Sequence, residues 1–578
     1  MKNSFFKREK FMTSYIQNRI QDWLKKPFDK TTIEKIEQLK KINPKELEDA
    51  FYTDLSFGTG GLRAIMGVGT NRINEYTIRK TTQGLAQYVK NQFPSDTNCV
   101  VIGFDSRNHS EEFAKEAASV LSHYGITVFL LKELRPTPYV SFACLYFKAK
   151  AAIMITASHN PKEYNGYKVY WQDGAQVVDP HDQGIIDAID NIPNFTAPLI
   201  PQNDLIHIVD DSLDLFYLKA IHSLQNFPEN NKCFGKDLRI VYTSLHGTGI
   251  TLAPKALKDW GFSSISFVES QIIPDGEFPT VRLPNPEYPE ALKLGVDLLQ
   301  ELNSDILLAT DPDADRLGVV VLHKGKPITL TGNETASLSI EYLCKVFKEK
   351  ENAPANPAFI TTVVSTDLID IICSFYQMPC FRVLTGFKYI GEKIHQWELD
   401  KSHSFIFGAE ESYGYLLGTH SRDKDAIVSC CLISEIALYL KKQGKTLVDF
   451  LEEIYQKYGV FRESQISIAF SPGKEGMESM QKTMVGLRKN PPTHISGKKV
   501  LLLEDYEKGI HELPPSDMLF LKLEEGYKLI IRPSGTEPKI KIYGSIQLPY
   551  NDPLEETIKQ ADAQLQNLLN QYKAKILE

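Results

Sequence analysis

The sequence predicts an α/β protein with three successive α/β domains built on mixed sheets, followed by a C-terminal α+β domain. The chain has 578 residues, and at roughly 100–200 residues per domain it has room for three to five domains. Over most of the chain, short apolar runs alternate with amphipathic segments, which is typical of parallel or mixed sheets covered on both faces. Near the C-terminus, apolar and polar residues instead alternate with a period of two.

The first α/β block follows a segment with helical spacing. There Thr31 and Thr32 are possible N-caps, and Asn43-Pro44 can begin a second short helix. The block itself has predicted strands over residues 100–104, 127–131 and 151–155, and an amphipathic helix over residues 111–123.

The later blocks continue the pattern. The second has predicted strands over residues 238–243, 305–309 and 318–322, and a helix over 250–260. The third has strands over 359–364 and 405–408, and helices over 333–348 and 366–376. The last has strands over 498–504, 526–532 and 539–546, and a long helix over 554–577.

Linkers are expected near residues 191–203, 324–327 and 455–461. They divide the chain into domain I with a helical extension (1–203), domain II (204–325), domain III (326–457) and domain IV (458–578).

Composition excludes several classes of protein. The formal net charge of −8 argues against a general nucleic-acid binder, and 42% hydrophobic with 24% charged residues argues against a disordered or collagen-like chain. No apolar run approaches the ~18 residues of a membrane span, and residues 1–10 do not resemble a secretory signal. Eight cysteines without Cys-x-x-Cys spacing indicate a reducing compartment and no zinc site. We therefore expect a soluble, cytoplasmic protein with no nucleic-acid or membrane partner.

Four loops that follow apolar runs are rich in reactive groups, as expected where strands of an α/β sheet end. The first contains Ser158, with His159 adjacent and Lys168 shortly after. A serine hydroxyl needs a base or an electrostatic partner to become a nucleophile. The Gly-x-Ser-x-Gly elbow of esterases is absent, and the loop by itself favours a serine in an Asn-Pro turn.

The second loop carries Asp311, Asp313 and Asp315, followed by Arg316. Alternate carboxylates in an extended loop suit a hard divalent cation, and three carboxylates with open positions favour Mg²⁺ shared with a phosphate. A solvated turn is the alternative, but three acids this close repel one another unless a cation is present.

The third loop contains Glu410 and Ser412, side chains suited to sugar hydroxyls, and is followed by Arg422 and Lys424. Upstream, Lys388 is a possible acid/base. A solvent-facing charge cluster is the alternative for this loop.

The fourth loop runs from Arg532 through Ser534, Gly535 and Thr536, a combination that can form an anion-binding nest or a plain turn. No Walker motif is present, and Arg63 occupies the third glycine position of a dinucleotide fingerprint. ATP and NAD are therefore not expected as ligands.

Together these motifs resemble the α-D-phosphohexomutase superfamily, especially its long phosphoglucomutase/phosphopentomutase branch. The resemblance covers nearly the whole chain after residue 50 and keeps the family's order of loops. It is carried by residues 58–69, 156–176, 311–316, 385–391, 410–425 and 532–539.

The resemblance implies a four-domain, heart-shaped enzyme in which each domain contributes one loop to a central cleft. Ser158 would carry a phosphate, and Mg²⁺ would bind Asp311, Asp313, Asp315 and an oxygen of that phosphate. The other implied catalytic residues are Arg63, His159, Lys168 and Lys388. The implied substrate-binding residues are Arg316, Glu410, Ser412, Arg422, Lys424, Arg532, Ser534, Gly535 and Thr536.

The implied reaction interconverts glucose 1-phosphate and glucose 6-phosphate through glucose 1,6-bisphosphate, which would also prime the enzyme. The sugar loop reads Ser412-Tyr413-Gly414-Tyr415, which departs from the histidine-containing pattern of mannose-phosphate relatives and favours glucose or pentose phosphates. Phosphopentomutase, phosphomannomutase and bisphosphate synthase activities stay open. So do an aspartyl-phosphate phosphatase using Asp311 and a non-catalytic sugar-phosphate sensor.

Overall fold

The computed structural model describes residues 14–25, 27–55, 57–58, 61–94, 97–193, 198–350, 354–471, 474–534 and 538–577. The chain divides into two compact units. The first comprises Met1–Gly318, Gly391–Gln396 and Tyr415–Ser434, and the second comprises Val319–Ile390, Trp397–Gly414 and Glu435–Glu578. Each unit is described by itself below.

Two short helices near the N-terminus, α2 (Lys30–Ile42) and α3 (Pro44–Phe51), confirm the predicted helical extension. The N-cap of α2 is Asp29 and not Thr31 or Thr32, because the Asp29 carboxylate accepts the Thr32 N–H. Asn43 caps α3 ahead of Pro44 as expected. The extension buries a cluster centred on Trp23.

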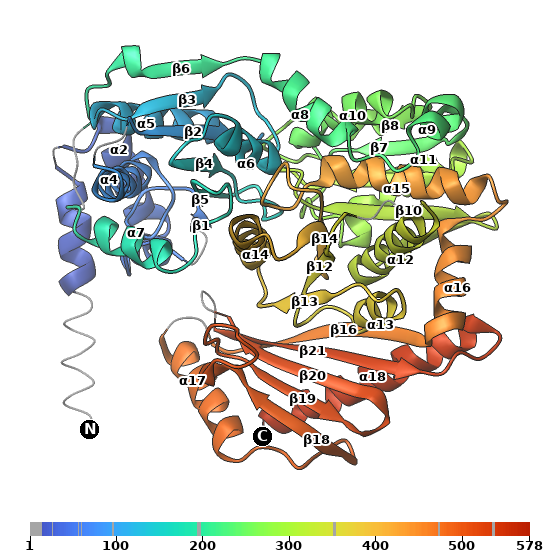
Figure 1. The fold of residues 1–578 in the computed structure, drawn as a ribbon. Coiled ribbons are helices and arrows are strands. Elements are labelled where there is room, and N and C mark those ends of the chain that lie inside the picture. The colour runs from blue at the N-terminus through green and yellow to red at the C-terminus, as the bar shows by residue number, and fades with distance from the viewer. Residues whose placement is uncertain are drawn as a thin grey trace. The chain divides into compact units, whose positions relative to one another are not determined.

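The first sheet has strand order β1-β5-β4-β2-β3-β6 (Figure 1). Strand β2 pairs in parallel with β3 and β4, and β5 and β1 complete one side in antiparallel pairing. Its strands are β1 (Gly61–Ile65), β2 (Cys99–Phe104), β3 (Thr127–Leu131), β4 (Ala151–Ile155), β5 (Tyr164–Trp171) and β6 (Ile206–Val209). Its helices are α4 (Glu75–Gln92), α5 (Ser110–His123), α6 (Thr137–Tyr146) and α7 (His181–Asp190). The three predicted strands of this block are confirmed.

The second sheet has strand order β11-β10-β9-β7-β8. Its strands are β7 (Ile240–Thr243), β8 (Ile265–Phe267), β9 (Ile306–Thr310), β10 (Leu317–His323) and β11 (Lys326–Leu330). Its helices are α8 (Ser212–His222), α9 (Pro228–Phe234), α10 (Ala253–Asp259) and α11 (Pro289–Glu301).

The segment expected as a linker at residues 324–327 is part of a regular hairpin. Lys324 and Gly325 form the tight turn of a hairpin between β10 and β11, with φ of 48° and 75°. Two left-handed residues in a row match the twist of a two-residue hairpin.

The third sheet has strand order β13-β12-β14-β15. Its strands are β12 (Pro357–Thr362), β13 (Cys380–Val383), β14 (Ser404–Glu410) and β15 (Gly414–Leu417). Its helices are α12 (Gly332–Lys350), α13 (Leu368–Phe375), α14 (Phe387–Asp400), α15 (Ala426–Lys441) and α16 (Leu447–Tyr458). Only Gly459 separates α16 from β16, so most of the linker expected at residues 455–461 is regular structure.

The C-terminal sheet is antiparallel, with strand order β16-β21-β20-β19-β18-β17 (Figure 1). Its strands are β16 (Val460–Ala469), β17 (His494–Ile495), β18 (Lys498–Asp505), β19 (Leu519–Leu523), β20 (Tyr527–Pro533) and β21 (Lys539–Leu548). Helices α17 (Lys474–Lys489) and α18 (Leu554–Leu577) bury its apolar face. The predicted fold class, three α/β domains with mixed sheets and an α+β C-terminal domain, is confirmed.

All eight cysteines lie in described segments, and none of them forms a disulfide there. Within the described ranges, no helix has both the length and the apolar character that crossing a bilayer would need.

Candidate active site

Ser158 follows the carboxyl end of β4 and is almost completely buried, with 2% of its surface exposed. Its backbone is left-handed, with φ of 51°, and its N–H donates to Thr156 Oγ1 at 2.8 Å. The Ser158 hydroxyl donates to Asp311 Oδ2 at 3.0 Å and lies 3.1 Å from His159 Nδ1. Because a hydroxyl has one proton, both contacts are satisfied when His159 donates from Nδ1.

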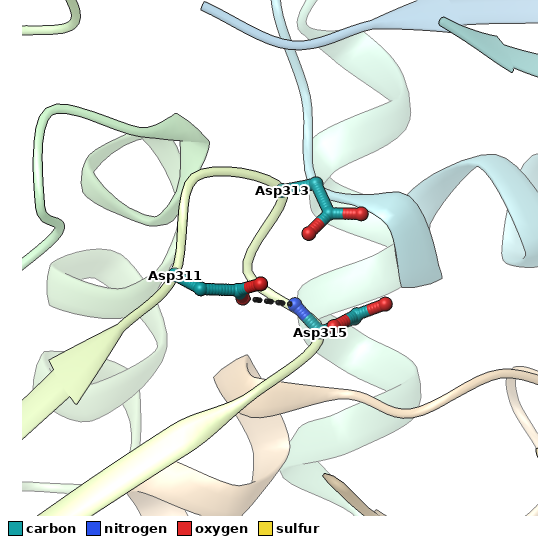
Figure 2. A group of neighbouring side chains, drawn as sticks. All are labelled: Asp311, Asp313 and Asp315. Carbon is teal, nitrogen blue, oxygen red and sulfur yellow. Dashed lines mark hydrogen bonds between the residues drawn. The ribbon is translucent and has the colours of Figure 1, made fainter. Parts of the chain in front are cut away.

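The metal loop, residues 311–316, follows β9 and brings its three aspartates together (Figure 2). One carboxylate oxygen of each lies within 4.8 Å of the others, and all three side chains are buried. Asp311 Oδ1 accepts the N–H groups of Asp315 and Arg316, at 3.1 and 3.0 Å. The loop thus folds back on its own first carboxylate.

Two lysines neutralise part of this acidic cluster. Lys168 on β5 donates to Asp313 at 2.7 Å and to Asp315 at 3.1 Å, and Lys424 lies 3.3 Å from Asp315. Burial raises the pKa of Asp311 well above its usual value, and repulsion from Asp313 and Asp315 adds to the rise. Burial alone would also raise the pKa of Asp315, but Lys168, Lys424 and Arg316 outweigh it and lower that pKa.

The donor set fits a divalent cation. Asp313 Oδ1 and Asp315 Oδ1 are buried and have no hydrogen-bond partner within the described structure. A buried carboxylate oxygen without a partner is costly unless a ligand compensates it. Oxygen-only ligands of this kind are those that hard divalent cations prefer.

His159 lies among cations next to Ser158. Partial burial, Arg316 and Arg63 hold the pKa of His159 well below its usual value, so its ring is neutral at physiological pH. Arg63 on β1 donates to Asn160 Oδ1 at 2.9 Å, because the β1–β5 register places Arg63 opposite Gly166. Arg316 lies 4.0 Å from Asp315 and 3.7 Å from Glu287.

Arg422 belongs to the loop between β15 and α15 and is buried. Its N–H donates to Ser141 Oγ at 2.9 Å, and its guanidinium donates to the Thr419 and Ser421 carbonyls of its own loop.

The first unit brings together the predicted residues Ser158, His159, Lys168, Arg63, Arg316, Lys424 and the three aspartates.

In the second unit, the sugar loop (residues 410–412) is joined to the start of α14. Glu410 Oε1 accepts the Gly386 N–H at 3.0 Å, and Lys388, two residues further on, is largely buried beside Tyr389. Ser412 is half-buried in the turn between β14 and β15. Burial and the neighbouring Glu410 raise the pKa of Glu411 to about 7.

The predicted phosphate loop connects β20 to β21. Arg532 lies opposite Lys541, and the Ser534 N–H closes the loop by donating to the Lys539 carbonyl at 2.8 Å. Gly535 and Thr536 lie outside the described residues. Burial and Glu411 raise the pKa of Tyr543 on β21 to about 12, while Arg532 opposes the rise. The Tyr543 phenol is therefore affected by Glu411, next to the sugar loop residue Glu410, and by Arg532 of the phosphate loop.

Sequence reasoning missed the residues that hold these groups in place. Thr137 at the start of α6 donates its hydroxyl and its N–H to Asp313, at 2.7 and 2.8 Å. Asp423 accepts from Tyr170, Gln176 and Lys424, and so orients the Lys424 ammonium. Arg107 donates to backbone carbonyls of the Ser158 loop. The available signal was a charged residue directly after a buried strand, as in Asp105-Ser106-Arg107 after β2.

Family models match three successive parts of the chain. They are described as phosphoglucomutase/phosphomannomutase alpha/beta/alpha domain I, II and III, and match residues 54–195, 216–325 and 331–458.

Two relatives named phosphoglucomutase match nearly the full length. The protein of Staphylococcus haemolyticus is 38% identical over 533 residues, which is 88% of this chain and 94% of the relative. The protein of Staphylococcus epidermidis RP62A is 36% identical over 537 residues, which is 89% of this chain and 95% of the relative. A Paramecium phosphoglucomutase, the exocytosis-sensitive phosphoprotein pp63/parafusin, has the same fold, with a TM-score of 0.70 at 17% identity over 91% of this chain and 95% of that one.

The fold, the three domain matches and the relatives all point to one family of sugar-phosphate mutases. The chain belongs to the phosphoglucomutase/phosphomannomutase family. It is an enzyme, an intramolecular phosphotransferase that acts as an isomerase.

The metal loop packs so closely on Gly247 that a methyl group there would lie 2.2 Å from Pro312 Cα. Gly247→Ala is therefore expected to lower the free energy of unfolding by about 1–3 kcal/mol, and to reduce turnover because Thr248 N–H would lose its 2.7 Å contact with the Pro312 carbonyl. Thermal unfolding and initial rates measure both effects. Gly486→Ala on α17 is the matched control, since nothing lies within 4 Å of the added carbon. Equal behaviour of the two variants would contradict this account of the loop.

Proposed function

We propose that the enzyme interconverts α-D-glucose 1-phosphate and glucose 6-phosphate through a phosphoserine at Ser158 and a glucose 1,6-bisphosphate intermediate, which also primes it. The observation that carries the proposal is the Ser158 hydroxyl, held 3.0 Å from a buried aspartate of a three-carboxylate loop. Relatives named phosphoglucomutase, 36–38% identical over most of the chain, support glucose phosphate as the substrate.

The reaction takes two phosphoryl transfers. In the first, the P–O bond to Ser158 Oγ breaks as a bond forms to a free sugar hydroxyl, whose proton passes to a base. In the second, the bisphosphate presents its other phosphate, whose P–O bond to the sugar breaks as the P–O bond to Ser158 Oγ forms again, and the released sugar oxygen takes back a proton from the base. The transferring group is strongly anionic, so catalysis is mainly positioning and charge compensation.

The residues of the first unit suit the transferring phosphoryl group. We assign Ser158 as its carrier, and His159, Lys168, Arg63 and Arg316 as the groups around it. Lys424, whose ammonium lies 3.3 Å from Asp315, fits this end of the substrate. Lys388 keeps the acid/base role that the family resemblance gives it.

Mg²⁺ is the proposed cofactor, held by Asp311, Asp313, Asp315 and an oxygen of the phosphorylated Ser158. The two buried aspartate oxygens without partners support it. When bound, Mg²⁺ supplies positive charge against the phosphoryl oxygens.

The second unit supplies the proposed grip on the rest of the substrate. Glu410 and Ser412 are assigned to the sugar hydroxyls, and Arg532 with Ser534, Gly535 and Thr536 to the phosphate that is not reacting. Arg422, from the first unit, is assigned to substrate binding as well. A cytoplasmic location is also proposed, and the eight cysteines, none of which forms a disulfide in the described residues, support it.

The burial of Asp311 argues against the aspartyl-phosphate phosphatase alternative. One of its oxygens accepts two backbone N–H groups and the other accepts the Ser158 hydroxyl, so neither is exposed for attack on a phosphate. Phosphopentomutase, phosphomannomutase and bisphosphate synthase activities are the remaining alternatives.

A comparison of substrates tests the proposal. Turnover of the 1-phosphates of glucose, mannose, ribose and deoxyribose is measured with and without glucose 1,6-bisphosphate. We expect the highest kcat/KM for glucose 1-phosphate, with a lag that the bisphosphate removes. A higher kcat/KM for a pentose phosphate would reassign the substrate.

Ser158→Ala should abolish turnover while preserving the fold, because no other hydroxyl takes the place of Ser158 at Asp311. Intact-mass measurement after incubation with glucose 1,6-bisphosphate should show one added phosphoryl group on the native protein and none on the variant. Ser119→Ala, on the exposed face of α5, is the control and should be phosphorylated normally. Full activity of Ser158→Ala would end the phosphoserine proposal.

Removal of divalent cations should stop turnover, and Mg²⁺ should restore it.

Asp313→Asn should weaken Mg²⁺ binding measured by calorimetry, because it removes a charged ligand. Asp297→Asn on the exposed face of α11 should bind Mg²⁺ like the native protein. Undiminished turnover in chelator-treated protein would refute the metal assignment.

A further inference from the structure

Arg107 occupies an unusual position beneath the Ser158 loop. It lies three residues after β2, and β2 pairs in parallel with β4, so the loops that follow both strands begin side by side. Its side chain is completely buried, as is that of Asp105. A buried guanidinium must have most of its five donors satisfied, so the groups that accept from Arg107 indicate its structural role.

Those partners are main-chain carbonyls of the nucleophile loop. Arg107 Nη2 donates to the carbonyl of Ser158 at 2.6 Å and to that of Asn160. Nη1 donates to the carbonyls of Pro161 at 2.8 Å and Tyr164 at 3.0 Å. One side chain thus gathers four carbonyls from a segment of seven residues, and the loop curls around it.

Arg107 is itself fixed from the other side. Asp105 Oδ2 lies 3.5 Å from Arg107 Nε, and Asp105 Oδ1 accepts the Arg107 N–H and the Ser110 hydroxyl. The guanidinium carbon also lies 4.9 Å from the centre of the buried Phe278 ring. Four carbonyl dipoles that converge in a buried space would repel one another without this cation.

The Ser158 backbone needs such support. Its φ of 51° is one that side chains other than glycine adopt at a cost, and it persists only where surrounding contacts hold it. The short contact from Arg107 is made to the Ser158 carbonyl itself, one peptide unit from the strained torsion. The same conformation directs the hydroxyl toward Asp311 and His159.

From this geometry we infer that Arg107 is a positioning residue for phosphoryl transfer, whose guanidinium holds the backbone of residues 158–164 in the shape that presents Ser158 Oγ. The inference rests on the proposed role of Ser158. Arg107 contacts carbonyls and not the reacting oxygen, so it acts through Ser158. Lysine cannot replace it, because a single ammonium does not span four carbonyls with a planar fork.

The test compares Arg107→Lys with Arg79→Lys. Arg79 is an equally buried arginine on helix α4, which belongs to the same sheet, and it pairs with Glu116. We expect Arg107→Lys to lower kcat about tenfold to a hundredfold, the cost of displacing a reacting group by about 1 Å, with KM for glucose 1-phosphate changed less than about twofold. The single-turnover rate of Ser158 phosphorylation by glucose 1,6-bisphosphate should fall equally, since both transfers use the same oxygen.

A chemical rescue separates positioning from stability. Arg107→Ala should regain part of its kcat when guanidinium ion is added at millimolar concentration, whereas urea at the same concentration should have no effect. Thermal midpoints of all variants are recorded in parallel. Two results would overturn the inference. One is that Arg107→Lys and Arg79→Lys lose the same stability and the same kcat. The other is that the kcat of Arg107→Lys stays within about twofold of the native value. A native enzyme that never becomes phosphorylated would instead overturn the proposed function, so the two failures are distinguishable.

Discussion

Three carboxylates gathered in one buried loop are the constraint on which the first unit depends. Ionised carboxylates at this distance and depth repel one another, and each would cost several kcal/mol if left uncompensated. The compensation comes from separate parts of the chain: Lys168 on β5, Thr137 at the start of α6, Ser158 after β4 and Lys424 after β15. The loop is stable only when these segments are in place. This is a physical reason why Tyr415–Ser434, far along the chain, belongs to the first unit.

Local positive charge also explains how a protein with a negative net charge can hold a strongly anionic phosphoryl group. The formal charge of −8 describes the whole chain, whereas the surroundings of Ser158 contain Arg63, Arg107 and Arg316, all of which act on the titration of His159. Net charge governs solubility, and the local field governs binding. Buried lysines on Asp313 and Asp315 leave one oxygen of each aspartate without a hydrogen-bond partner among the described residues, and a divalent cation is the ligand that such oxygens suit.

Much of this could be predicted from the sequence, because its signals are local. Strands β2, β3 and β4 are short apolar runs that a two-sided sheet requires, and the triad of alternating aspartates directly follows one such run. The hairpin between β10 and β11 was mistaken for a linker because Lys324-Gly325 reads as polar loop, and only its backbone torsions show a tight turn. Arg107, which sequence reasoning missed, is a different case. Its role, like the contact of Lys424 with Asp315, depends on which carbonyls and carboxylates the fold brings to it, and composition carries no record of those partners.

The division of roles between the two units follows from the chemistry of a mutase. One serine must receive phosphate from two different oxygens of the same sugar, so the sugar has to be held in two orientations. The phosphoryl site therefore benefits from rigidity, and in the first unit buried charges and an arginine-templated loop provide it. The grip on the sugar has the opposite requirement, because contacts that demand one orientation would block the second transfer. In the proposed function, a few polar side chains on loops, Glu410, Ser412 and Arg532, meet that requirement, since polar contacts to hydroxyls and a phosphate do not demand one ring orientation. A rigid phosphoryl site and a sugar site that accepts two orientations thus favour different parts of the chain, and the proposed roles follow this division except for Lys388 in the second unit and Arg422 in the first.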